Sequence, residues 1–258
     1  MKAEFSTEDA HKKQAELSRQ IIFQDKLPQN ITKIAGVDVA YEQNISIGAT
    51  VVLDHQTLEL CEFSTSQSET EFPYIPTLLS FREIRPALMS IRKIRVEPEF
   101  FLVDGQGFAH PYGCGFACHL GLIIKKPTIG VAKTRLIREL CGRRQGIEFL
   151  RFNGKIVGAA VTTKKDAKPV YVSVGHMISL ATAIRIVKHC STKSRIPEPI
   201  LKAHEIATEE KRKLHIHESQ QKKCETQSIE PKNQKSGEPD PRQKASHQSL
   251  RATGRSFL

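Results

Sequence analysis

The chain has 258 residues, 39% apolar and 26% charged, which is enough to bury the core of one large domain. Lys and Arg outnumber Asp and Glu by 39 to 28, and this net charge of +11 favours a polyanionic partner, nucleic acid before an anionic membrane surface. No apolar run reaches the roughly 18 residues of a membrane span, the first residues lack a secretory signal, and six scattered cysteines indicate a reducing compartment, so we expect a cytoplasmic protein.

The first part of the chain predicts a helix followed by a meander of strands. Residues 5–20 have the apolar periodicity of an amphipathic helix. Three β-rich runs joined by short turns follow it, which favours antiparallel pairing. These runs cover residues 33–41, 46–54 and 57–64. After Pro73 and Pro76, a second helix is predicted as far as about residue 95.

The second part alternates strands and helices, so the fold class is mixed α/β. The strand FFLVD at 100–104 stops at a glycine-rich turn, and Ser179 is placed to cap a later helix. The predicted helices cover residues 114–124, 179–190 and 200–213, and the predicted strands cover 128–132, 155–163 and 169–174.

Residues 215–258 contain few apolar side chains and cannot bury enough surface to offset their ordering entropy. We therefore predict a folded body over 1–214 and a disordered, polar, basic tail over 215–258. A solvated passenger segment is the expected role of the tail, with weak nucleic-acid binding or localisation as alternatives.

Basic charge is concentrated in one stretch of the body. Residues 125–168 contain twelve Lys and Arg against three Asp and Glu, a net charge of +9. This stretch predicts a track for a phosphate backbone, and a solvated surface loop is the alternative.

Three carboxylates on separate elements are candidates for a metal site. Asp38 interrupts an apolar strand, Asp104 ends FFLVD, and Glu83 lies on the helix after PYIP. Carboxylates that converge repel one another unless a cation lies between them, and Mg²⁺ or Mn²⁺ prefers such oxygen ligands. Separate salt bridges, for example to Arg82 or Lys133, are the alternative.

Two loops are candidates for contacts with a base. In VDGQGFAHP, at 103–111, Gly105 and Gly107 allow backbone to approach a flat ligand closely. Tyr74 lies in PYIP, where two prolines stiffen the loop, and a rigid ring there can wedge between bases. A core aromatic is the alternative for Tyr74.

Six motifs occur in a fixed order over about residues 34–205. They are IAGVDVAY, PYIPTLLSFRE, LVDGQGFAHPYGCGFACHLG, PTIGVAK, YVSVGHMIS and RIPEPILKAH. In these motifs the chain resembles endonuclease V, the inosine-directed nuclease family. The resemblance implies a ribonuclease H-like α/β fold with a mixed five-stranded sheet flanked by helices.

The resemblance also assigns roles to individual residues. Asp38, Glu83, Asp104 and His204 correspond to the metal-binding positions, which implies Mg²⁺ as the cofactor, with Mn²⁺ able to substitute. Lys133 corresponds to the active-site lysine, and all five are expected to take part in catalysis.

The same resemblance implies a pocket for hypoxanthine. Tyr74, within the PYIP loop, corresponds to the wedge that fills the gap left by the displaced base. The backbone N–H groups near Gly105 and Gly107 are expected to read the O6 atom of the base. The residues expected to contact the substrate are Tyr74, Ile75, Pro76, Leu79, Gly105, Gly107, His110 and Leu136.

The implied reaction is hydrolysis of the second phosphodiester bond 3′ to inosine, leaving 3′-hydroxyl and 5′-phosphate ends. Repair of deaminated DNA is the leading role, and an inosine-specific endoribonuclease is the alternative. Two other readings stay open: a non-catalytic inosine-binding protein and a nuclease for another target, such as a junction. The expected partner is inosine-containing DNA or RNA, with no membrane, no obligate protein partner and a monomeric state.

Five residues depart from the family pattern. Thr77 replaces a glycine after PYIP and is expected to crowd the base pocket or change base selectivity. Gln106 replaces a His or Asn, Tyr112 and Gly113 replace a basic pair, and Met177 replaces an Arg. None of them is a predicted metal ligand, so activity is expected to survive.

Overall fold

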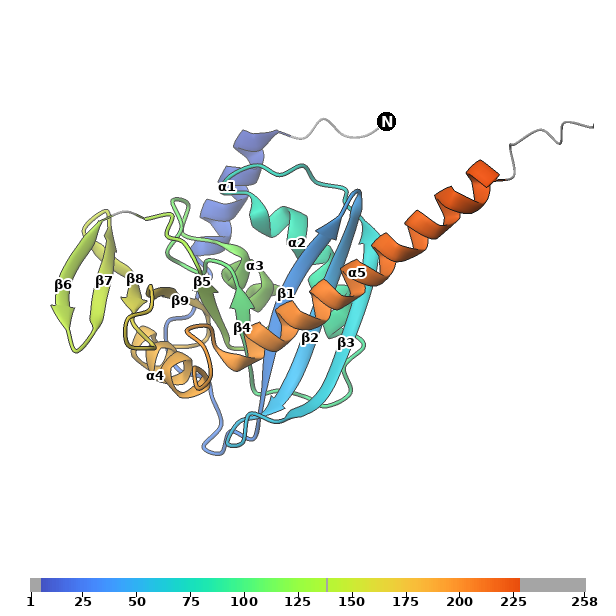
Figure 1. Cartoon of the computed structure of the whole chain (residues 1–258). Coiled ribbons are helices and arrows are strands. Elements are labelled where there is room, and N and C mark those ends of the chain that lie inside the picture. Colours follow the sequence, from blue (N-terminus) through green and yellow to red (C-terminus); the bar gives the residue numbers. More distant parts are fainter. Residues whose placement is uncertain (1–5, 138, 228–258) are drawn as a thin grey trace, which may run out of the picture. The chain divides into compact units, whose positions relative to one another are not determined.

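The computed structural model of the protein describes residues 6–137 and 139–227, with side chains as far as residue 216. A nine-stranded mixed sheet, in the order β3-β2-β1-β4-β5-β9-β8-β7-β6, organises these residues (Figure 1). Its strands are β1 (Lys33–Glu42), β2 (Ile45–Asp54), β3 (Leu60–Glu69), β4 (Phe100–Asp104), β5 (Thr128–Ala132), β6 (Leu140–Arg144), β7 (Ile147–Phe152), β8 (Lys155–Val161) and β9 (Val170–His176).

Five helices accompany the sheet in the described residues, each where the sequence predicts one. The Ser179 hydroxyl accepts a hydrogen bond from the Thr182 N–H at 3.2 Å, so the predicted N-cap is confirmed. The helices are α1 (Thr7–Ser18), α2 (Leu79–Ile91), α3 (Phe116–Ile124), α4 (Leu180–Cys190) and α5 (Glu198–Gln227).

The pairing of β1 decides where the acidic residues meet. Strands β1, β2 and β3 form the predicted antiparallel meander. On its other side β1 runs parallel to β4, with Val37 opposite Val103. The next residue on each strand is an aspartate, so Asp38 and Asp104 lie at the same edge of the sheet.

The sheet is larger than the five strands expected, although the mixed α/β class is confirmed. The addition comes from β9, β8, β7 and β6, which continue the sheet by antiparallel pairing. The β6–β7 hairpin carries no apolar alternation, because almost all of β6 is exposed. Its turn residues, Gln145 and Gly146, both have positive φ, as a two-residue hairpin turn requires.

Helices cover both faces of the sheet, which is why strand residues alternate between two cores. Val37 and Val103 lie in a cluster with residues of α2 and α3. Ile34 and Leu102 point the other way, into a cluster with residues of α4 and the first turns of α5. Gly36 allows α5 to begin against β1, since a Cβ there would lie 1.9 Å from the Pro199 carbonyl oxygen.

Helix α5 is longer than the helix predicted over 200–213. It continues to Gln227 because no Pro or Gly interrupts that segment. The predicted boundary at 215 stays a prediction, and residues 228–258 of the predicted tail lie outside the described residues. Among the described helices, none has the length and apolar character needed to cross a membrane.

Candidate active site

Asp38, Asp104 and His204 form a cluster at the edge of the sheet. One ligand atom from each lies within 4.8 Å of the others. His204 comes from α5, and its Nδ1 is 2.7 Å from Asp38 Oδ2. The hydrogen bond with Asp38 raises the pKa of the exposed His204 imidazole. Three of the four predicted metal ligands therefore meet, from three separate elements.

Lys133 extends this cluster on the side of β5. It follows the last residue of the strand, and its Nζ donates a hydrogen bond to Asp104 Oδ2 at 2.6 Å. Burial and the charge of Asp38 raise the pKa of Asp104, whereas Lys133 lowers it. The lysine keeps 41% of its side chain exposed, so it can also reach a ligand.

Glu83, the fourth predicted ligand, lies near the cluster but is not a member of it. It is 6% exposed on α2 and accepts a hydrogen bond from the Tyr41 hydroxyl at 3.2 Å. Burial, followed by the charges of Asp38 and Asp104, raises its pKa well above the usual range. The three acids therefore influence one another electrostatically.

This donor set fits a hard divalent cation. The buried Asp38, the partly buried Asp104 and an imidazole nitrogen converge, and a buried glutamate lies within their electrostatic reach. Burial and, after it, the repulsion between the carboxylates raise the pKa values of Glu83 and Asp104, and a cation among them would relieve that repulsion. The residues present are therefore suited to hold a hard divalent cation.

A cavity of about 300 Å³ borders the cluster, and Asp104 and Lys133 form part of its wall. We call it the base cavity. Tyr74 stands at it with 70% of the residue exposed, so the alternative of a core aromatic is excluded. All the predicted substrate-contacting residues except Gly107 line it: Tyr74, Ile75, Pro76, Leu79, Gly105, His110 and Leu136.

The predicted backbone donors are already occupied. The Gly107 N–H donates to Ser173 Oγ at 2.9 Å, and the Gly105 N–H donates to the Val131 carbonyl at 3.1 Å. Gly107 is a glycine because its backbone approaches β9, where a Cβ would lie 2.2 Å from the Val174 carbonyl oxygen. These two N–H groups are therefore not free to read O6 in this structure, and the reading of O6 by another backbone N–H near them stays a prediction.

His110 joins the two loops of the base cavity. It is 3% exposed, and burial lowers the pKa of its imidazole to about 4, so the ring is neutral near pH 7. Its Nδ1 accepts a hydrogen bond from the Tyr112 N–H at 3.2 Å, which places the ring proton on Nε2. A hydrogen bond with the backbone of Thr77 links the ring to the PYIP loop.

Helix α1 forms hydrogen bonds with the loops that line the base cavity, and the sequence did not predict this role. Gln14 is fully buried, and its Nε2 donates to the Thr77 carbonyl at 2.8 Å and the Cys114 carbonyl at 2.9 Å. His11 Nε2 lies 2.9 Å from the Thr77 hydroxyl. A polar residue on an amphipathic helix normally faces solvent, so the sequence contains no signal for this contact.

Thr77 lines the base cavity, as its position after PYIP predicts. Its φ is +74°, a left-handed conformation that is costly for a β-branched residue. The contacts with His11 and Gln14 hold it in that conformation. Whether the side chain changes base selectivity stays a prediction.

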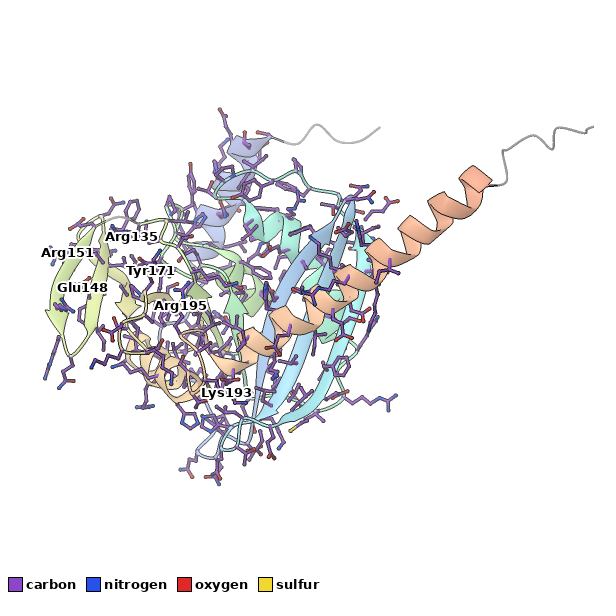
Figure 2. The ribbon with its side chains drawn as sticks, viewed as in Figure 1. Arg135, Glu148, Arg151, Tyr171, Lys193 and Arg195 are labelled. Carbon is purple, nitrogen blue, oxygen red and sulfur yellow. The ribbon has the colours of Figure 1, made fainter. Side chains whose placement is uncertain are left out.

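The basic stretch 125–168 lies partly around this edge of the sheet. In Figure 2, Arg135 and Arg151 appear over the part of the molecule built by β6–β9. Both are exposed, and Arg135 makes no ion pair with the other described residues, whereas Arg151 lies 3.9 Å from Glu139. These side chains are available to a polyanion, and the phosphate track stays a prediction.

Comparison with known proteins identifies the family. Residues 15–205 match the family model described as Endonuclease V. Endonuclease V of Trichormus variabilis is 44% identical over 208 residues, covering 79% of this chain and 94% of the relative. Endonuclease V of Thermofilum pendens is 42% identical over 205 residues, covering 79% and 88%.

Solved structures agree in fold. Endonuclease V from Streptomyces avermitilis superposes with a TM-score of 0.76 at 35% identity, covering 81% of this chain and 95% of that chain. Endonuclease V of Ciona intestinalis, solved with a DNA containing an inosine followed by a ribo-adenosine, gives 0.74 at 31% identity, covering 80% and 98%. The chain therefore belongs to the endonuclease V family, and it is a nuclease.

Proposed function

We propose that this nuclease recognises inosine in nucleic acid and hydrolyses, with Mg²⁺, the second phosphodiester bond 3′ to it. One observation carries the proposal: Asp104, a member of the acidic cluster, and Lys133, its hydrogen-bond partner, both form part of the wall of the base cavity. A base bound in the cavity thus brings its own strand next to the acids. Mn²⁺ is expected to substitute because it accepts the same ligands.

The residues of the cluster and the two charged residues beside it have distinct parts. Asp38, Asp104 and His204 would hold the cation, with Glu83 adding negative charge from α2. A divalent cation held there would offset the charge on the scissile phosphate and would lower the pKa of an attacking water. Lys133 lies within hydrogen-bond distance of Asp104 and is placed to orient that water or a phosphate oxygen. The products carry 3′-hydroxyl and 5′-phosphate ends.

The base cavity supplies recognition. It encloses about 300 Å³ between the PYIP loop and the loop that follows β4, with Tyr74 exposed at its wall. Tyr74 is placed to fill the gap that a displaced base leaves in its strand. Inosine pairs weakly, so it leaves the stack at a lower cost than a normal base. The inosine-containing DNA in the Ciona intestinalis complex supports this substrate.

Repair of deaminated DNA is the role we assign first, and cleavage of inosine-containing RNA is the alternative. We further propose a monomer in the cytoplasm, with residues 1–214 as the catalytic domain and 215–258 as a tail that adds backbone affinity. The net charge of +11 supports a nucleic-acid partner.

Cleavage mapping tests the proposal. Three end-labelled substrates with one inosine each, single-stranded RNA, single-stranded DNA and duplex DNA, would be incubated with Mg²⁺ or EDTA. We expect a Mg²⁺-dependent cut at the second bond 3′ to inosine, with 5′-phosphate product ends. The ranking of the three substrates decides between DNA repair and RNA cleavage.

A different outcome would favour the remaining alternatives. Binding to inosine strands without any cut would indicate a non-catalytic binder, which the intact acidic cluster argues against. Cutting that ignores inosine and follows branched structure would indicate a junction nuclease, for which a base cavity has no use.

A further inference from the structure

A second cavity adjoins the base cavity across His110. It has a volume of about 370 Å³ and is formed by the end of α1, the loop 108–113 and the turn between β7 and β8. His110 belongs to the walls of both cavities and is 3% exposed. One buried imidazole therefore separates the two spaces.

Aromatic side chains dominate this second cavity. Phe108, Tyr112 and Phe152 all line it. The Tyr112 ring is stacked on His11, with centroids 3.9 Å apart and planes at 10°. Tyr112 nevertheless stays 37% exposed, so one part of the ring is open to a ligand. Exposed rings of this kind are platforms on which nucleic-acid bases stack.

The rim of the second cavity is polar and positively charged. Asn153 and Lys155, on the β7–β8 turn, are both exposed at its edge. Lys155 forms no ion pair and no side-chain hydrogen bond with the other residues that the structure describes. An aromatic floor with an unpaired cation at the rim matches a base attached to a phosphate.

The loop that carries Tyr112 is fixed before any ligand binds. The Tyr112 N–H donates to His110 Nδ1, and Gly113 N–H donates to the His110 carbonyl at 2.8 Å. Gly113 has a φ of +66°, which closes the turn and which a side chain would strain. A platform already held in place loses little entropy on binding.

We propose that the second cavity binds the base of the nucleotide 5′ to the inosine, with Lys155 beside that nucleotide's phosphate. The inference rests on the proposed function, which places the 3′ side of the strand at Asp104. The second cavity contains none of the proposed metal ligands, so the strand reaches it from the 5′ side. A base held there is unpaired, so the substrate is single-stranded or locally opened at this position.

A mutant cycle between the protein and the flanking base tests this assignment. The substrates are single-stranded inosine oligonucleotides whose 5′ neighbour is either adenosine or an abasic residue. Removing the base is expected to lower kcat/KM of the unmodified protein about 10-fold, within the range for one stacked base. Tyr112→Ala should lose about as much on the adenosine substrate and less than twofold on the abasic one.

Three further variants act as controls. Tyr112→Phe keeps the ring and should restore nearly all of the activity. Lys155→Ala should weaken binding to both substrates and reduce its salt dependence, since it removes a phosphate contact. Lys188→Ala removes an exposed lysine that lies outside the basic stretch 125–168 and lines neither cavity, and it should leave kcat/KM unchanged.

Two results would overturn the assignment. Equal losses for Tyr112→Ala on the adenosine and abasic substrates would show that the ring does not contact that base. If the effect of Tyr112→Ala depends instead on an abasic residue on the 3′ side of inosine, the cavity binds the 3′ neighbour and the assignment is wrong. Affinities of the same variants for the same substrates, measured in EDTA by fluorescence anisotropy, report on the second cavity without cleavage. A failure of the catalytic proposal is thus distinguishable from a failure of this one.

Discussion

Asp38 is the residue on which the proposed chemistry depends most. It is 7% exposed, and its Oδ2 is hydrogen-bonded to His204 Nδ1. A buried carboxylate is costly unless a positive group faces it, which favours a role in binding a cation. Asp38→Ala should lower kcat by at least about 10³-fold, while affinity for inosine strands changes little. Single-turnover cleavage and anisotropy on the same oligonucleotide measure the two quantities. Cleavage close to that of the unmodified protein would remove Asp38 from the mechanism.

Thr77 allows a test of conformational strain against hydrogen bonding. Its φ of +74° costs about 1–2 kcal/mol, and Gly removes that strain while adding about 0.5–1 kcal/mol of backbone entropy loss. Both Gly and Val remove the hydrogen bond with His11, worth about 1 kcal/mol, but Val keeps the strain. Thr77→Gly should therefore change stability by less than about 1 kcal/mol, and Thr77→Val should be less stable than Thr77→Gly. The midpoints of urea unfolding compare the stability of the two variants. Equal losses of stability would show that the positive φ of Thr77 carries no strain.

Single residues also show how far the sequence predicts the site. Asp38 was recognisable because a carboxylate inside an apolar strand needs a partner. Its partner His204 is 166 residues away, and only the resemblance pointed to it. Gly105 and Gly107 were correctly placed near the site, but their N–H groups bond within the protein, which composition and spacing do not reveal.

At the scale of elements, helix α4 is anchored by an aspartate far away in the sequence. Asp25 accepts hydrogen bonds from the Ser179 N–H at 2.7 Å and the Thr182 hydroxyl at 2.9 Å. Partial burial acts to raise the pKa of Asp25, but these hydrogen bonds together lower it below 3.8. The charged form is therefore favoured in the folded protein.

This anchor predicts a pH-dependent loss of stability. Because the folded pKa is depressed, the contribution is fully present above the ordinary pKa and is lost as pH falls through the folded value. Asp25→Ala should cost about 1 kcal/mol near neutral pH, and the difference should shrink below about pH 3.8. Urea unfolding of both proteins across that range measures it. A difference that stays constant with pH would mean that the charge of Asp25 is not involved.

The β6–β7 hairpin and the contact of α1 with the cavity loops were not predicted, because neither produces a hydrophobic pattern in the sequence. Strand β6 is almost fully exposed and β7 has a single buried residue, Leu150, so the hairpin lacks the regular alternation by which a half-buried strand is recognised. The contact of α1 with the cavity loops depends on two polar residues of that helix, the buried Gln14 and His11, and the apolar periodicity of the helix gives no sign of either contact. Buried strands such as FFLVD were predicted to the residue, because both of their faces lie in a core.

At the scale of the whole molecule, charge decides how the protein meets its substrate. Residues 228–258 carry six Lys and Arg against three Asp and Glu. Removing them should weaken affinity for single strands at low salt by a few fold and lower the salt dependence, with kcat unchanged. Binding titrations at several salt concentrations, with turnover measured in parallel, check this. A collapse of kcat would mean that the segment belongs to the catalytic body.

The central claim is that the Asp38–Asp104–His204 cluster and the base cavity form one active site for inosine. The most direct measurement is kcat/KM for two single strands that differ only by inosine or adenosine at one position, each with Mg²⁺ and with EDTA. We predict at least about a 100-fold preference for the inosine strand with Mg²⁺, and no cleavage of either strand with EDTA. Equal cleavage of the two strands, or cleavage that persists in EDTA, would contradict the account.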